Sequence, residues 1–194
     1  MFEPMVKRIP QGAKGVAKVR HITITPQAAQ TMILREVITR GREKSSPAGE
    51  YCQLIVDGEL MMSDTRLEHD TNQTVVWKAS GDVLIAGLGI GLILVPILAK
   101  ASVRGVTVVE LHQDVIDLVA PNFNDDRLQI ICGDIYSWKP VKGTKFQTIY
   151  FDIWPNICLS NRNQMMKLER RFRTHLDKGG WMNSWAKELC GKWS

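Results

Sequence analysis

The stretch from residue 81 to residue 96 is the feature that most constrains the fold of this chain. It consists of a short apolar run, Gly81 to Ala86, then three glycines at alternate positions, Gly87, Gly89 and Gly91, and then a second apolar segment. The order of strand, tight turn and helix start is typical of a nucleotide site in a parallel α/β sheet. Glycine suits such a turn because a side chain would hold a ligand away from the backbone, and because tight turns often require positive φ.

Downstream of this stretch, predicted strands alternate with predicted helices. Strands are expected at residues 105–110, 128–132, 146–151 and 181–185, and helices at residues 92–101, 114–120 and 162–176. The alternation favours an α/β fold with a mostly parallel sheet, right-handed crossovers and helices on both faces. Gly179 and Gly180 are interpreted as the turn into the fifth strand. Because only nine residues follow Trp185, we expect the sheet to be truncated after that strand.

The N-terminal part has a different pattern. Residues 1–25 contain prolines, glycines and scattered charges, which predict a partly ordered leader ending in an extended piece. Apolar positions at helical spacing predict a helix over residues 26–40. Asp57-Gly58 predicts a small β-hairpin between residues 51–56 and 59–62.

A short helix is expected over residues 66–77, capped by Ser63 or Asp64. The chain is therefore predicted to have two parts. Residues 1–78 would form an N-terminal extension with a helix and a β-hairpin, and residues 79–194 a nucleotide-binding domain.

Charge and cysteine content limit which partners, metal sites and cellular compartment we expect. Lys and Arg outnumber Asp and Glu by 25 to 20, giving a net charge of +5, which permits an anionic partner without requiring one. The four cysteines form no CxxC pair and have no metal-ligand spacing with the histidines, so no metal site is expected. The cysteine pattern suggests no disulfide framework either, so a reducing cytoplasm fits best. We expect a soluble, intracellular protein, because the chain shows neither a signal-peptide core nor an apolar run of membrane-spanning length.

Three acids fall at predicted strand ends, together with the glycine turn. Glu110 ends the second strand 19 residues after Gly91, where a carboxylate can accept both hydroxyls of a ribose. Asp134 can accept a hydrogen bond from an adenine amino group, and Asp152 ends the fourth strand. Each feature alone has a simpler interpretation, as a packing turn, a solvent-facing acid or a capping acid. Their coincidence indicates an adenosine site.

Four segments resemble the motifs of class I S-adenosylmethionine (SAM)-dependent methyltransferases, over about residues 80–185. They are the glycine motif at residues 83–91, the strand at residues 106–110, residues 132–135 and residues 149–152. The resemblance implies a Rossmann-like domain, SAM as cofactor and Asp152 as the catalytic residue at the reactive methyl. It also implies a set of cofactor-binding residues: Gly87, Leu88, Gly89, Gly91, Glu110, Leu111, Asp134 and Ile135. A dinucleotide site is disfavoured because Leu92 stands where the third glycine of that fingerprint is needed.

Within this superfamily the chain looks similar to spermidine synthase and its relatives. The hairpin at residues 56–58 and the polar segment containing His69 resemble the aminopropyltransferase layout. Met61 and Met62 stand near the place of a glutamine in the polyamine enzymes, and residues 152–156 replace their Asp-rich motif. The pattern at residues 152–154 and the tryptophan-rich end also look like small phage-encoded proteins labelled methyltransferase.

Substrate contacts are expected from Asp64, His69, Trp154 and Asn156. The alternatives are an ordinary polar connection for the first two and a packed tryptophan for Trp154. Residues 152–156 lack the motif that holds a flipped adenine, and no Pro-Cys pair provides a cytosine-attacking thiolate, so DNA base methylation is disfavoured. Basic residues at 167–173 either approach phosphates or form a solvated face.

The sequence predicts a SAM-dependent transferase that transfers a methyl group to an unidentified amine or other small acceptor. One alternative is an aminopropyltransferase-like enzyme that uses decarboxylated SAM. The other is a non-catalytic adenosine-binding or interaction protein. A small-molecule substrate is favoured over nucleic acid. A homo-oligomer is expected because an uncovered sheet edge invites pairing.

Overall fold

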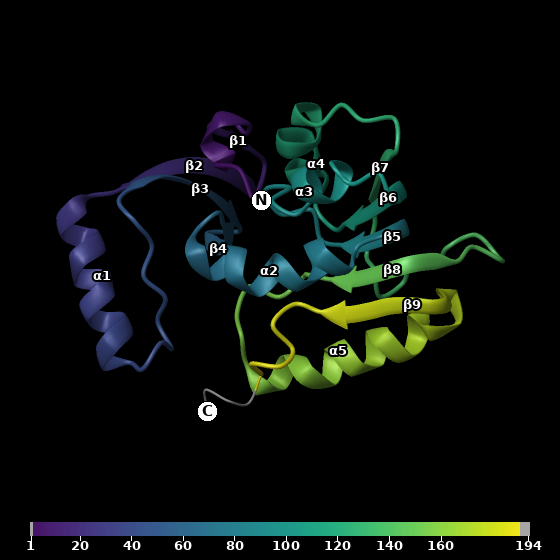
Figure 1. Cartoon of the computed structure of the whole chain (residues 1–194). Coiled ribbons are helices and arrows are strands. Elements are labelled where there is room, and N and C mark those ends of the chain that lie inside the picture. Colours follow the sequence, from purple (N-terminus) through teal and green to yellow (C-terminus); the bar gives the residue numbers. More distant parts are fainter. Residues whose placement is uncertain (1, 191–194) are drawn as a thin grey trace.

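The computed structural model describes residues 2–190 of the 194-residue chain and contains two sheets (Figure 1). The N-terminal sheet is antiparallel, and its strand order is β1 (Gly12–Lys14), β2 (Ala17–Ile24), β3 (Gly49–Val56) and β4 (Glu59–Ser63). The second sheet is parallel throughout, and its strand order is β7 (Leu128–Cys132), β6 (Val103–Glu110), β5 (Gly81–Ala86), β8 (Phe146–Phe151) and β9 (Leu176–Ser184). The predicted α/β class is confirmed.

Five α-helices connect these strands in the described part of the chain. They are α1 (Pro26–Ile38), α2 (Arg66–Lys78), α3 (Leu94–Leu98), α4 (Gln113–Val119) and α5 (Leu159–Phe172). No helix within residues 2–190 combines the length and the apolar character needed to cross a lipid bilayer.

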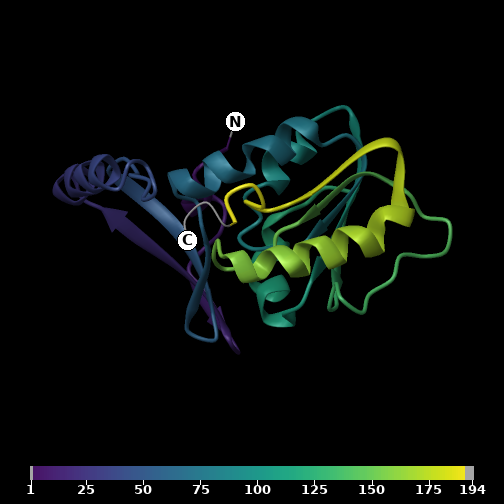
Figure 2. The same ribbon diagram turned by 90° about the horizontal axis from the view of Figure 1, so that it is seen from below.

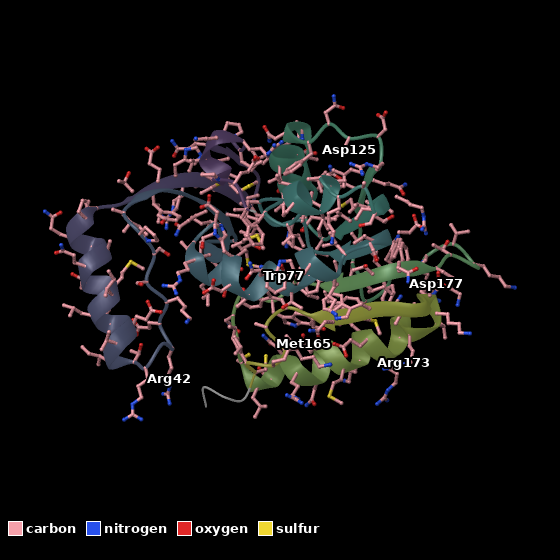
Figure 3. The ribbon with its side chains drawn as sticks, in the orientation of Figure 1. Arg42, Trp77, Asp125, Met165, Arg173 and Asp177 are labelled. Atoms are coloured by element: carbon pink, nitrogen blue, oxygen red, sulfur yellow. The ribbon has the colours of Figure 1, made fainter. Side chains whose placement is uncertain are left out.

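Both faces of the parallel sheet are covered, as predicted, because successive strand residues point to opposite sides. Val83 and Ile85 of β5 face a core with α2, α3 and α4, whereas Leu84 and Ala86 face a second core with α5. Figure 3 shows the consequence for this region: Met165 of α5 points toward the sheet, and Arg173, directly after α5, points outward.

The N-terminal leader is more ordered than the sequence suggested. Met5 and Ile9 are completely buried, and residues 5–7 form a 3-10 turn. They share a single core with β2, β3, β5 and β6. The sequence did not predict this because Met5 and Ile9 are isolated apolar residues among prolines and glycines. They lack the periodicity from which a buried element is predicted. The boundary between residues 78 and 79 stays a prediction, since this core includes residues from both sides of it.

The hairpin is confirmed and is part of a larger sheet. Asp57 and Gly58 have φ values of 50° and 82°, as a two-residue hairpin turn of this composition requires. β2 and β1 extend the hairpin to four strands. The helix α1 begins with Thr25, whose Oγ1 accepts a hydrogen bond from the Ala28 amide at 3.2 Å, and it lies at one end of the molecule, away from the parallel sheet (Figures 1 and 2).

Two helix predictions need correction. The N-cap of α2 is Thr65, because both Asp64 carboxylate oxygens accept hydrogen bonds from other segments. The helix after the glycine turn has five residues instead of the expected ten over residues 92–101. Pro96 explains part of this difference, because it has no amide hydrogen to donate to the carbonyl of Leu92.

The turn before the fifth strand was also misplaced. α5 continues into a 3-10 turn at Arg173–His175, and β9 starts directly afterwards, at Leu176. Gly179 and Gly180 lie within β9 at a register shift against β8, between the pairs Phe146–Leu176 and Thr148–Trp181. A Cβ atom on Gly180 would lie 2.8 Å from the carbonyl oxygen of Gln147, so this bulge excludes a side chain.

Candidate functional site

A cavity of about 360 Å³ lies at the carboxyl ends of the parallel strands. Its floor comes from the segments after β5, β6, β7 and β8, and its opposite wall comes from the β3–β4 hairpin. The volume falls within the range of small-ligand sites. Its lining residues are Leu54, Val56, Met61, Met62, Gly87, Gly89, Val109, Glu110, Leu111, His112, Val115, Gly133, Asp134, Ile135, Tyr136, Asp152, Ile153, Trp154 and Gln164.

The turn requires glycine at three positions, because of its backbone conformation and its close neighbours. Gly87, Gly89 and Gly91 have φ values of 94°, 54° and 73°. A Cβ atom would overlap the Asp152 carbonyl oxygen at Gly87 and the Met62 sulfur at Gly89. At Gly91 it would overlap the ring of Phe123. Gly87 and Gly89 line the cavity, whereas Gly91 packs beside it.

Glu110 ties the glycine turn to the next strand. One carboxylate oxygen accepts a hydrogen bond from the Leu88 amide at 2.8 Å, and the other accepts one from the His112 amide at 2.9 Å. Leu88 is buried below the cavity, and its role is this backbone contact. Each oxygen of Glu110 keeps acceptor capacity for a ligand hydroxyl. Leu111 is 58% exposed and provides an apolar surface at the cavity mouth.

Asp134 is the second residue after β7. Its Oδ1 accepts a hydrogen bond from the Tyr136 amide at 2.8 Å, which forms a local turn. Ile135 is buried and lines the cavity with Asp134. The sequence thus placed both residues beside the same cavity as the glycine turn.

Asp152 follows β8 and lines the cavity next to Gly87. Its amide donates to the Ala86 carbonyl at 2.8 Å, so the strand pairing holds it at the centre of the sheet edge. Burial raises the pKa of Asp152 to about 7. A carboxyl group with such a pKa can exchange protons near neutral pH, as a general base requires.

Trp154 belongs to a polar group that the sequence did not reveal. Its Nε1 and the hydroxyl of Tyr136 both donate to Oε1 of Gln164, each at 3.0 Å. Trp154 is 7% exposed, which agrees with the packed interpretation, and it also lines the cavity. Because Gln164 Oε1 accepts two bonds, its amide nitrogen is the donor left for a ligand.

The other three predicted substrate residues lie outside this cavity. Asp64 is 2% exposed, and its oxygens accept the amides of Met5 at 2.7 Å and Cys52 at 2.6 Å. The ring of His69 stacks on Phe2 with centroids 4.8 Å apart. Asn156 is exposed, and its carbonyl accepts a bond from Asn161.

The hairpin wall was missed because its lining residues look like ordinary core residues. Leu54, Val56 and Met62 follow the strand alternation, and only their position across from Gly89 makes them part of the site. The one available signal was the pair Met61 and Met62, which stands where the polyamine enzymes have a polar residue.

The basic helix has a mixed role. Arg171 is turned inward and donates to the carbonyls of Ile135 and Trp138, while Arg170 and Arg173 are exposed. Arg171 thus supports the segment that carries Asp134. Within residues 2–190, no group of three or more His, Cys, Asp or Glu side chains is arranged to hold a metal ion.

Comparison with known proteins identifies the fold. No family model and no curated protein matches the chain. The spermidine synthase of Thermotoga maritima matches 91% of this chain and 55% of its own, with 14% identity and a TM-score of 0.53. A spermidine synthase in complex with the transition-state analogue AdoDATO matches 92% and 56%, also with 14% identity and a TM-score of 0.53.

A Streptococcus mutans protein, provisionally described as a SAM-dependent methyltransferase, matches 70% of this chain and 38% of its own, with 14% identity and a TM-score of 0.51. This chain thus spans between 38% and 56% of the length of the solved structures that it resembles. The chain shares its fold with SAM-dependent methyltransferases and spermidine synthase.

Proposed function

We propose that this protein is a SAM-dependent transferase that methylates a small amine or another small acceptor. The observation that carries the proposal is the convergence of the glycine turn, Glu110, Asp134 and Asp152 on a single cavity. Glu110 would accept the ribose hydroxyls, and Asp134 and Ile135 would border the adenine. Gly87 and Gly89 keep the floor free of side chains where the nucleoside would approach the backbone.

The residues fit a sulfonium nucleoside in charge as well as in shape. Glu110, Asp134 and Asp152 are the acids of the cavity lining, and no Lys or Arg is among its residues. When bound, SAM supplies a methyl carbon made electrophilic by its sulfonium. Asp152 would orient the acceptor amine and take its proton, and the chain would otherwise contribute positioning.

The hairpin wall favours methyl transfer to an acceptor with an apolar body. Leu54, Val56, Met61 and Met62 face the acids across the cavity and provide no second carboxylate for a polyamine. Aminopropyl transfer from decarboxylated SAM is the second candidate, because the similarity to spermidine synthase includes 91% of the chain. The similarity to small phage-encoded proteins and the cytoplasmic location stay predictions.

Calorimetry tests the shared premise. We expect binding of SAM, its decarboxylated form or S-adenosylhomocysteine; if none binds, all three functions fail, including non-catalytic adenosine binding. Mass spectrometry of an incubation of the protein with cofactor and a panel of amines then separates methyl transfer, aminopropyl transfer and binding without turnover.

Asp152→Asn tests the catalytic assignment. We expect this variant to lose turnover and to keep nucleotide binding, because the amide retains the shape of the side chain and cannot take the proton. Asp82→Asn is the matched control, since Asp82 pairs with Arg104 at the opposite end of the same sheet. Full turnover by Asp152→Asn would remove Asp152 from the mechanism.

A further inference from the structure

The positive charge of this chain is concentrated in one segment. Residues 136–173 contain eight Lys or Arg and two Asp or Glu, which gives this segment a net charge of +6. Because the whole chain has a net charge of +5, all other residues together carry −1. Such an asymmetry indicates a surface that attracts an anionic partner.

The two acids of this segment are engaged elsewhere. Asp152 lines the cavity. Glu169 accepts hydrogen bonds from the Ser184 hydroxyl at 2.9 Å and from the Lys187 ammonium group. The cations that the segment exposes are therefore not neutralised by its own acids.

The exposed cations come from α5 and its end, and from the connection between β7 and β8. On α5 they lie outside the buried face, which includes Met165, Leu168 and Phe172. Six basic residues of the segment are exposed and form no salt bridge with any residue in 2–190. We call them the basic surface: Lys139, Lys142, Arg162, Lys167, Arg170 and Arg173.

Hydrogen bonds join the two parts of this surface. Arg171 of α5 donates to the carbonyls of Ile135 and Trp138, and Lys145 Nζ donates to the Thr174 carbonyl at 2.7 Å. In both views the connection that leads into β8 lies beside the C-terminal end of α5 (Figures 1 and 2). The cations of the two parts therefore belong to adjoining surfaces.

An aromatic ring lies at the edge of the basic surface. Tyr136 is 44% exposed, and its hydroxyl donates to Gln164 of α5 at 3.0 Å, which holds the ring beside the helix. Lys167 follows Gln164 by three residues and so lies on the same side of α5. Proteins that bind single-stranded nucleic acids combine cations for the phosphates with aromatic rings on which bases stack.

The arrangement along α5 suits a linear polyanion better than a lipid surface. From Arg162 to Arg173 the cations extend over about 16 Å at the rise of a helix. Insertion into lipid needs a continuous apolar face. The exposed apolar residues of α5, Leu159 and Met166, are two turns apart, and Arg162 lies between them.

We propose that the basic surface and Tyr136 bind a single-stranded nucleic acid. The phosphates lie along α5 and its neighbouring connection, and an unpaired base stacks on the Tyr136 ring. This proposal adds a macromolecular partner and does not depend on the transferase activity proposed above.

Fluorescence anisotropy over a series of salt concentrations tests the phosphate contacts. The probes are labelled oligouridine RNA and oligothymidine DNA of about 15 nucleotides, long enough to cover one binding site. We expect the logarithm of the binding constant to fall with the logarithm of salt concentration at a slope of about −2.8, as four phosphate contacts give for a single strand.

The double variant Lys167→Gln/Arg170→Gln removes two of these contacts. We expect weaker binding and a slope of about −1.4, because each lost contact lowers the slope by about 0.7. The matched control is Arg35→Gln/Arg42→Gln, which removes the same charge from exposed positions on α1 and after it, away from α5 (Figures 1 and 2). This control should bind like the unmodified chain.

Tyr136→Leu tests the stacking contact separately. We expect binding to weaken about tenfold while the salt slope stays unchanged, because the ring carries no charge. Tyr136→Phe retains the ring and should bind within about threefold of the unmodified chain. Equal weakening in the leucine and phenylalanine variants would remove stacking from the proposal.

Three results would overturn the proposal as a whole. They are the absence of binding to either oligonucleotide at about 50 mM salt, where phosphate contacts are strong, equal losses in the α5 and α1 double variants, and binding to phosphatidylserine vesicles that neither oligonucleotide displaces. The first needs no variant, so it does not depend on how any substitution affects folding. Failure of SAM binding in calorimetry would instead count against the transferase alone.

Discussion

Acids in similar positions have different roles in this molecule because their oxygens have different partners. Asp64 and Glu110 each accept two backbone amides, which fixes neighbouring segments. Asp152 is half-buried in the cavity wall and accepts no backbone amide from the described residues, so nothing offsets the desolvation that raises its pKa. The acid that the local structure stabilises least is the acid that we assign to chemistry.

Asp152 should make stability depend on pH. A carboxyl group whose folded pKa is about 7, against its ordinary value of 3.8, resists ionisation in the fold, so stability falls as pH rises between these values and then levels off. Asp152→Asn removes this dependence and should stabilise the protein at pH 8 by up to about 4 kcal/mol, with little effect at pH 4. Denaturant unfolding at both pH values measures the difference. An equal effect at both values would contradict the assigned burial cost.

The glycine turn predicts an order of tolerance. In Gly87→Ala the new Cβ meets backbone, which cannot move aside, whereas in Gly89→Ala it meets the flexible Met62 side chain. Both substitutions also impose positive φ on alanine. We expect the free energy of unfolding to fall by about 3 kcal/mol or more in Gly87→Ala and by about 1–2 kcal/mol in Gly89→Ala. Urea unfolding checks this order. Equal losses of stability would show that the positive φ, and not the steric overlap, determines the cost of both substitutions.

At the scale of elements, the site depends on segments that are distant in sequence. The hairpin forms the wall opposite the glycine turn, and the hairpin is held in turn by Asp64, which joins the N-terminal segment to β3. The strand and turn that carry the glycine motif therefore form only one side of the cavity.

Asp64→Asn should loosen this connection. The amide can accept with one oxygen only, so either the Met5 or the Cys52 amide loses its partner, at about 1–3 kcal/mol. Hydrogen exchange at these two amides should accelerate. The β5 amides should change only as much as the lower free energy of unfolding of the whole protein requires. Asp57→Asn, at the hairpin turn, is the control, because asparagine also accepts positive φ there. Unchanged exchange at both amides would refute the structural role of Asp64.

At the scale of the whole molecule, α1 extends from the rest of the fold (Figure 2). Ile33, Leu34, Val37 and Ile38 are 53–79% exposed, and they form two adjacent stripes on one side of this helix. The charged residues Arg35 and Glu36 lie outside these stripes, so two copies could pack α1 against α1 without opposing like charges. We propose this face, in place of an open sheet edge, as the contact of the expected homo-oligomer.

Sedimentation velocity at micromolar concentration tests this contact. The unmodified chain should sediment as an oligomer and Val37→Asp as a monomer, because a buried unpaired carboxylate is costly in such a contact. Ala28→Asp, on an exposed position outside the apolar stripes, should remain oligomeric. A monomeric unmodified chain, or an oligomeric Val37→Asp, would exclude this face.

The sequence by itself determined the parallel sheet, the Asp-Gly hairpin and the strand-end positions of Glu110, Asp134 and Asp152. These features are local, since they depend on periodicity, on turn residues and on the rule that parallel strands end at one edge. The glycine spacing correctly marked a strand and a tight turn, although only the packing against Asp152, Met62 and Phe123 explains each glycine.

Tertiary structure alone decided the hairpin wall, the Gln164 contacts and the buried hydrogen bond between Tyr150 and Asn72. It also showed that Asp64, His69 and Asn156 lie outside the cavity and that Met5 and Ile9 are buried. The physical reason is that burial and hydrogen-bond partners arise between segments 10 to 114 positions apart, as for Gln164 with Trp154 and for Trp185 with Thr71. No local pattern encodes which of two polar side chains will face a ligand and which will face the backbone of another segment.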